Sequence, residues 1–118
     1  MARGQPIDLG SLVIPQDQQE SSFIDFRKKP LRGIIIFAPL ELNGAVTMEV
    51  SGNFFLQLSN PELITWQKLQ SGGQNIPVGA NQAVPLDFVG WDAFRLVSNQ
   101  AGGESVERVF VVKGVEEL

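Results

Sequence analysis

Residues 46–60 read VTMEVSGNFFLQLSN, a stretch in which apolar and polar residues alternate on both sides of Gly52-Asn53. Alternation with a period of two places successive side chains on opposite faces of a β-strand. Residues 46–50 form such a strand before the turn, and residues 54–58 form another after it. Because Gly and Asn readily supply the positive φ angles of tight turns, the stretch predicts a β-hairpin.

The same rhythm continues beyond the hairpin, with turn-forming clusters roughly every eight to twelve residues. Strands are predicted between these clusters and upstream of them, and no long segment shows the apolar period of a helix. The sequence therefore predicts an all-β fold: an antiparallel β-sandwich, a jelly roll or a related Greek key, with about eight strands. The run 31–38 is nearly continuous in β-branched residues, which predicts burial on both faces, and Gly33 within it suggests a bulge or a close backbone approach. The downstream clusters are Ser59-Asn60-Pro61, Gly72-Gly73, Gly79-Ala80-Asn81 and Gly90-Trp91-Asp92.

The N-terminal segment differs from the rest because Gly and Pro interrupt it repeatedly. We expect residues 1–20 to form an extended arm carrying one edge strand, ahead of a β-sandwich domain over residues 21–118. Such an arm is either loosely ordered or laid across a neighbouring subunit. In the second case its contacts with that neighbour would come from Leu9, Leu12 and Ile14.

The composition excludes several kinds of chemistry. The chain has 118 residues, a net charge of −4, no Cys and no His. Without them, disulfides, thiolate metal sites and nucleophile–histidine catalysis are ruled out. The acidic balance disfavours nucleic acid, and the longest apolar run is too short for a membrane helix. The first residues lack the apolar core of a signal peptide. The carboxylates of Asp87 and Asp92 are expected to face solvent, so we expect no enzyme and no cofactor.

Several residues are candidates for contacts with a partner protein. Trp91 lies between Gly90 and Asp92, where a turn presents it to a partner, or else it folds back over the end of the sandwich. Phe55 follows Phe54, so one of the two rings is expected on the outside of its strand. The basic cluster Arg27-Lys28-Lys29 is either a solvated turn or a docking patch for an acidic surface. Apolar residues on both faces of several strands indicate an oligomer.

Four segments carry a resemblance to a known class of protein: GNFFLQLS (52–59), TWQKL (65–69), FRLVS (94–98) and RVFVV (108–112). Their order resembles that in small virion proteins of tailed bacteriophages, and most of all in capsid decoration (cement) proteins. The resemblance implies a non-enzymatic homo-oligomer, often a trimer, that is made in the host cytoplasm. It would bind the major capsid protein on the outer surface of the virion. The alternative is a carbohydrate- or receptor-binding module of a phage tail or fibre, with Trp91 and Trp66 stacking on sugar rings.

Overall fold

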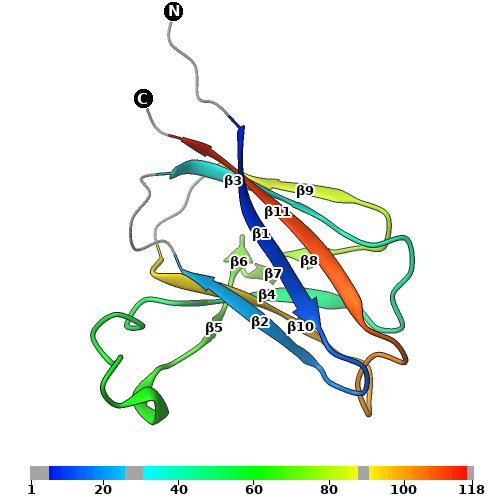
Figure 1. The fold of residues 1–118 in the computed structure, drawn as a ribbon, viewed down its shortest axis with the longest axis horizontal. Helices are drawn as coiled ribbons and strands as arrows, with labels where there is room; N and C mark the ends of the chain where they lie inside the picture. The colour runs from blue at the N-terminus through cyan, green and yellow to red at the C-terminus, as the bar shows by residue number, and fades with distance from the viewer. Residues whose placement is uncertain (1–5, 26–30, 88–90, 117–118) are drawn as a thin grey trace, which may run out of the picture.

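Two antiparallel sheets pack face to face around one apolar core (Figure 1). The computed structural model describes residues 6–25, 31–87 and 91–116. The first sheet has the order β1-β11-β3-β9, and the second has the order β2-β10-β4-β5, with β8 also pairing with β4. The strands are β1 (Pro6–Ile14), β2 (Glu20–Asp25), β3 (Leu31–Phe37), β4 (Val46–Ser51), β5 (Gln67–Lys68), β6 (Gln70–Ser71), β7 (Gln74–Asn75), β8 (Pro77–Val78), β9 (Ala83–Leu86), β10 (Ala93–Ser98) and β11 (Arg108–Glu116).

The chain alternates between the two sheets except at β4, β5 and β8, which all lie in the second sheet, while β6 pairs with β7 in a separate two-stranded sheet. The two strand orders are those of a jelly roll. The predicted all-β antiparallel sandwich is therefore confirmed. The described residues contain eleven strands rather than about eight, because the segment between β4 and β9 breaks into strands of only two residues. Eight strands make up the linear orders of the two main sheets.

The expected edge strand near the N-terminus is β1, but it belongs to the sandwich and not to a separate arm. Leu12 and Ile14 have no exposed surface, and Leu9 packs against the core. A bulge at Leu9, between the pairs Asp8–Lys113 and Gly10–Val112, shifts the register by one residue. The core covers Leu12 and Ile14 completely, so the prediction that these two residues contact a neighbour is wrong, whereas Leu9 is only half-buried and its contact stays a prediction.

The close backbone approach predicted at Gly33 in strand β3 is confirmed. A methyl group added at Gly33 would lie 2.5 Å from the carbonyl oxygen of Leu86, so only Gly allows β9 this near. Burial on both faces of β3 was not found. Ile34 and Ile36 lie in the core, whereas Phe37 is 38% exposed on the other face.

The predicted second strand of the hairpin, residues 54–58, is wrong. After β4 the chain leaves the sheet and forms a loop over residues 52–66, which contains a 3-10 helix, η1 (Pro61–Leu63). Backbone hydrogen bonds within the loop replace a strand ladder, for example from Gln57 N to Asn53 O at 3.1 Å. Figure 1 shows this loop in green, projecting beyond the second sheet.

Candidate functional site

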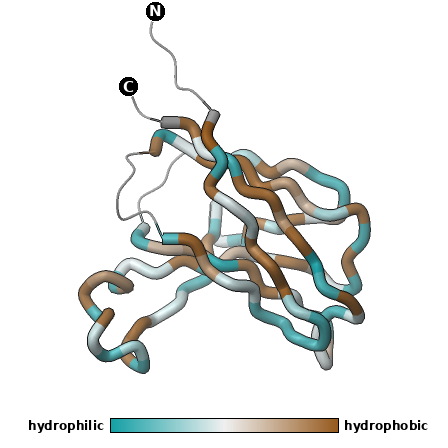
Figure 2. The backbone as a smooth tube through the Cα atoms, in the orientation of Figure 1, coloured by the Kyte–Doolittle hydropathy of each residue, from teal (hydrophilic) through white to brown (hydrophobic). Residues whose placement is uncertain are grey.

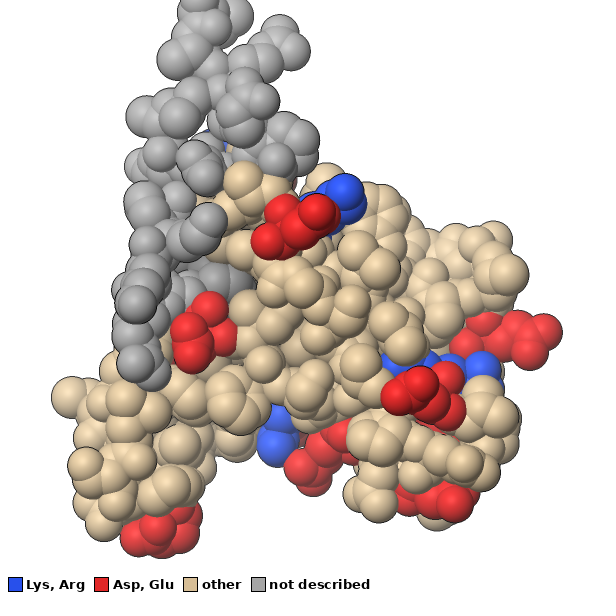
Figure 3. All heavy atoms as spheres, in the orientation of Figure 1, with Lys and Arg blue, Asp and Glu red and all other residues tan. Residues whose placement is uncertain are grey.

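The outer face of the first sheet is largely apolar. Its register places Val111 between Ser11 and Phe37. Val111 is 41% exposed, although it lies on an inner strand of its sheet. In Figure 3 the surface over β1 and β11 is mostly free of charged side chains, and Figure 2 shows apolar positions along both strands. The apolar side chains of this face include Val13, Ile35, Phe37, Ala83, Pro85, Val109 and Val111.

Charge within these paired rows is confined to one end of the face. There Lys113 Nζ lies 3.1 Å from Asp8 Oδ1, and both side chains are well exposed. An ion pair of this kind contributes little to stability. Most of the outer face of the first sheet therefore lacks the charged side chains that usually cover a solvated sheet.

The outer face of the second sheet is polar by contrast. The register aligns Phe23, Arg95, Glu49 and Lys68 in one row across β2, β10, β4 and β5. The Arg95 guanidinium lies 2.7 Å from Glu49 Oε1 and 3.0 Å from Glu20 Oε2. The two outer faces thus differ in kind: the middle of the second carries paired charges that suit water, with exposed Phe23 at its β2 edge.

The side chain of Asn53 fastens the loop of residues 52–66 at its base. Its Oδ1 accepts hydrogen bonds from Thr65 N at 3.0 Å and Thr65 Oγ1 at 3.3 Å, while its Nδ2 donates to Leu63 O at 3.2 Å. These bonds bring the two ends of the segment together, as in an Ω-loop. The loop presents Leu56 to solvent with 82% of its surface exposed.

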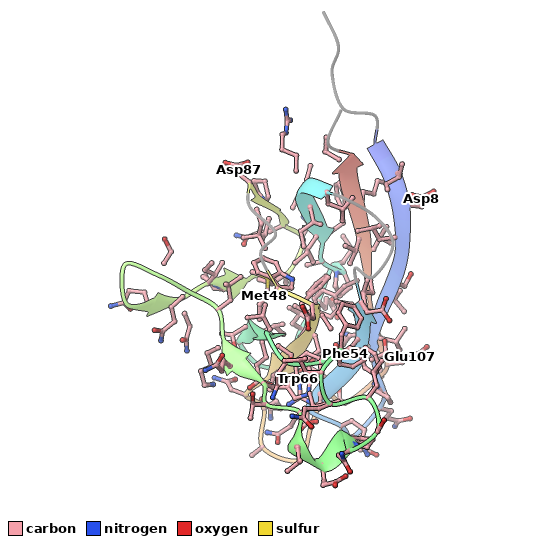
Figure 4. All side chains as sticks on the ribbon, turned by 90° about the vertical axis from the view of Figure 1, so that its left-hand side faces the viewer. Asp8, Met48, Phe54, Trp66, Asp87 and Glu107 are labelled. Carbon is pink, nitrogen blue, oxygen red and sulfur yellow. The ribbon has the colours of Figure 1, made fainter. Side chains whose placement is uncertain are left out.

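An aromatic cavity lies between this loop and the outer face of the second sheet. Phe54 stands 5.0 Å from Phe23 and 6.5 Å from Trp66 between ring centroids, and Figure 4 shows Phe54 and Trp66 close together. The Arg95 guanidinium carbon lies 4.6 Å above the Trp66 ring, a cation–π contact. The cavity measures about 330 Å³ and is lined by Ser21, Phe23, Phe54, Leu58, Pro61, Ile64, Trp66 and Arg95.

The structure separates the two tryptophans in a way the sequence did not predict. Trp91 is half-buried and packs against the core, which supports the alternative in which it folds back over the sandwich. Trp66 lies in an alternating stretch, a pattern typical of a core residue, but it lines the aromatic cavity instead. Phe55 is half-buried on the loop, and its N–H donates to Asp92 Oδ2 at 3.1 Å. Asp92 is therefore a loop anchor as well as a surface carboxylate.

The basic cluster Arg27-Lys28-Lys29 lies outside the described residues. Sequence reasoning missed Leu56 and Phe23 as candidate contact residues. The predicted strand placed Leu56 on the same face as Phe54, and the sequence offered no long-range signal that would bring Phe23 to Trp66.

One buried carboxylate joins two loops at the opposite end of the second sheet. Glu104 has no exposed surface, and its oxygens accept hydrogen bonds from Asn43 N (2.8 Å), Gly44 N (3.0 Å), Ser98 Oγ (2.6 Å) and Arg108 Nε (3.0 Å). Burial by itself raises the pKa of Glu104, but these four donors outweigh it and leave the pKa below its ordinary value. The carboxylate is saturated with structural partners, so we assign it to stability and not to acid–base chemistry.

Within residues 6–25, 31–87 and 91–116, no group of three or more Asp or Glu side chains could hold a metal ion. The described part of the chain also has no helix long and apolar enough to span a membrane.

Comparison with known proteins gave no match to a family model, a curated protein or a solved structure.

Proposed function

We propose that this chain is a non-enzymatic structural protein of a phage virion, which decorates the outer surface of the capsid and stabilises the shell. The observation that supports this proposal most is the apolar outer face of the first sheet. Val109, Val111 and Phe37 are exposed there by 42%, 41% and 38%. Contact area, rather than a reacting group, is what this surface offers.

The contrast between the two sheets fits a protein that lies on a shell. A decoration protein has one side against the capsid and one side in water. The outer face of the first sheet suits the covered side, since burying its valines and Phe37 removes apolar surface from water. The charged part of the outer face of the second sheet, with Arg95 paired to Glu49 and Glu20, suits a side that faces away from the shell. Binding to the assembled shell alone would stabilise that state by mass action.

The proposed partners are the major capsid protein and further copies of this chain. The resemblance to decoration proteins implies a trimer, made in the host cytoplasm and located on the virion. Jelly rolls occur in viral capsid proteins and also in lectins, so the fold by itself is an analogy that favours neither.

The alternative, a carbohydrate- or receptor-binding module, draws on the aromatic cavity. Sugar rings stack on exposed, flat aromatic faces. Here the planes of Phe23 and Phe54 are tilted by 50° and 61° from that of Trp66, and the Arg95 guanidinium lies over one side of the Trp66 ring. Trp91 packs against the core. The geometry therefore favours the structural role over a sugar platform.

A co-sedimentation experiment with capsids of the encoding phage tests the proposal. We expect the wild-type chain to pellet with assembled capsids and Val111→Lys to lose most of this binding, because a charge would be buried against the shell. Gln74→Lys is the matched control, since Gln74 is exposed on the β6–β7 hairpin. Thermal unfolding of both variants checks that they fold. Wild-type protein that stays in the supernatant, or equal binding by Val111→Lys, would refute the proposal, as would a gene with no virion genes around it.

A further inference from the structure

Leu56 and the aromatic cavity are complementary features on one chain: an exposed apolar side chain and an apolar cavity beside the same loop. Leu56 is exposed by 82%, and the cavity of about 330 Å³ is lined mainly by Phe23, Leu58, Trp66 and their apolar neighbours. We propose that Leu56 of one copy inserts into the aromatic cavity of a second copy, and that the second copy's Leu56 inserts into the cavity of the first. The contact is a reciprocal pair.

The loop that carries Leu56 is already ordered before any contact forms. Gln57 N donates to Asn53 O at 3.1 Å, which fixes the turn around Leu56, and the Asn53 side chain joins the loop ends through Leu63 O and Thr65. Asp92 adds a further anchor at Phe55 N. A side chain presented on such a turn loses little conformational freedom when it binds, so more of the contact free energy appears as affinity.

The cavity is suited to an aliphatic side chain. Its rings are inclined to one another by 50° to 61°, which makes a concave surface instead of a flat platform. Phe23 is 49% exposed and Leu58 is 45% exposed, so the cavity is open to a side chain that arrives from outside. A leucine that enters would cover the exposed parts of both and would itself leave water.

Charge complementarity points to a second copy of this chain as the occupant. Glu62 is the single ionisable residue between positions 50 and 66, so the loop carries one negative charge. Lys68 is exposed and lies in the same row of the second sheet as Arg95, which lines the cavity, with Glu49 between them. Arg95 is already paired with Glu49 and Glu20. Lys68 is therefore the cation of this row that Glu62 of a second copy would meet.

The symmetry of the pair follows from where the two features lie. Because residues 52–66 supply both Leu56 and part of the cavity wall, a two-fold axis brings both contacts together in one closed interface. The pair forms in solution without a capsid, so it does not depend on the proposed function. It also requires an even number of copies, which distinguishes it from the trimer that the resemblance implies.

Light scattering coupled to size exclusion tests the pair first. We expect the wild-type chain to have the mass of a dimer, with Leu56→Ser raising the dissociation constant about tenfold or more. Leu40→Ser is the matched control, since Leu40 is 77% exposed on the loop between β3 and β4, and it should leave the dissociation constant unchanged. Monomer mass at all concentrations, trimer mass, or equal effects of the two variants would overturn the proposal.

Tryptophan fluorescence locates the contact. In a Trp91→Phe background, Trp66 is the remaining tryptophan, and its emission should shift to the blue as the protein concentration rises, because Leu56 excludes water from the cavity. Leu56→Ser should abolish the shift. Emission that does not change with protein concentration would overturn the proposal. If the emission shifts only when an oligosaccharide is added, the cavity is a ligand site and not a contact between copies.

A charge exchange tests reciprocity. Glu62→Lys and Lys68→Glu should each weaken the pair, since each sets like charges against one another. An equimolar mixture of the two variants should associate again, because both contacts of the mixed pair then unite opposite charges. Thermal unfolding of each variant shows whether Lys68→Glu, which faces Glu49, still folds. Folded variants whose mixture remains monomeric would exclude the reciprocal arrangement.

Discussion

Replacing Glu104 with Gln tests whether a buried carboxylate joins the loops around Asn43 and Ser98. Asn43 N and Arg108 Nε donate to Oε1, while Gly44 N and Ser98 Oγ donate to Oε2. An amide of the same shape keeps one acceptor oxygen but puts an NH₂ group in the place of the other. If that group replaces Oε2, the Ser98 hydroxyl can rotate to accept from it, whereas the Gly44 N–H faces another donor.

The expected loss follows from these two changes. A buried N–H left without an acceptor costs about 1–3 kcal/mol, and the bond from Arg108 loses about 1 kcal/mol when its acceptor becomes neutral. The sum is about 2–4 kcal/mol, close to the range for breaking a buried charge pair. For 118 residues, at about 4 °C per kcal/mol, the melting temperature should fall by roughly 8–16 °C.

Urea unfolding at pH 7, followed by circular dichroism, measures this loss. Glu107→Gln is the matched control, because Glu107 also lies just before β11 but is exposed. Its effect on the free energy of unfolding should stay within about 0.5 kcal/mol. A loss below about 1 kcal/mol for Glu104→Gln, or an equal loss for Glu107→Gln, would refute the assigned role. Glu104→Asp keeps the negative charge but should also destabilise the fold, since the shorter side chain cannot reach both loops.

The structure supports three further predictions. Because hydrogen bonds lower the pKa of Glu104, folding favours its ionised form. The stabilising contribution of ionised Glu104 is therefore present above pH 4.5, the ordinary pKa, and is lost as the pH falls through the folded pKa. In urea unfolding at a series of pH values, the free energies of unfolding of wild type and Glu104→Gln should converge in acid. Gly103→Ala should destabilise the fold by about 3 kcal/mol in urea unfolding, because its φ is +87° and a Cβ would collide with the backbone of Asp17. Gly102→Ala, with φ +78° and open space around it, should cost only about 1 kcal/mol. Asn53→Ala should raise hydrogen exchange over residues 52–66 while changing global stability by about 1–2 kcal/mol, whereas Asn60→Ala, whose side chain makes no capping hydrogen bond, should change neither.

The fold class was predictable because alternation and turn chemistry recur along the chain. The register of β1 was harder to predict, because Ile7 and Leu9 are at odd positions and Leu12 and Ile14 at even positions, which a regular strand would place on opposite faces. A bulge beside Gly10, whose φ is +102°, turns both pairs toward the core, where Leu12 and Ile14 are buried and Ile7 and Leu9 are half-buried. The change of face across Gly10 is therefore a sign of a bulge that can be found in the sequence, although Gly and Pro in the same segment favour an arm.

The loop of residues 52–66 could not be predicted from local pattern. Five residues with period two fit a strand, but the same residues also fit a turn that buries Phe54 and exposes Leu56. Long-range bonds decide between the two, from Asn53 to Thr65 and from Phe55 to Asp92. The buried state of Glu104 was hidden for the same reason, because its donors come from segments up to 61 residues away in sequence.

The two proposed contacts use different sheets, so pairing and capsid binding should be separable yet coupled. A pair joined at the aromatic cavities leaves both outer faces of the first sheets uncovered. If these faces reach neighbouring sites on a repeating shell, the second attachment becomes intramolecular and can raise the avidity by about 10²–10⁴. Leu56→Ser should then weaken capsid binding by removing the pair, whereas Val111→Lys should abolish binding and leave the pair intact. Light scattering and co-sedimentation on the same two variants give both readouts. Loss of capsid binding in Val111→Lys together with loss of the pair would show that one surface serves both contacts, contrary to the assignment made from the two sheet faces.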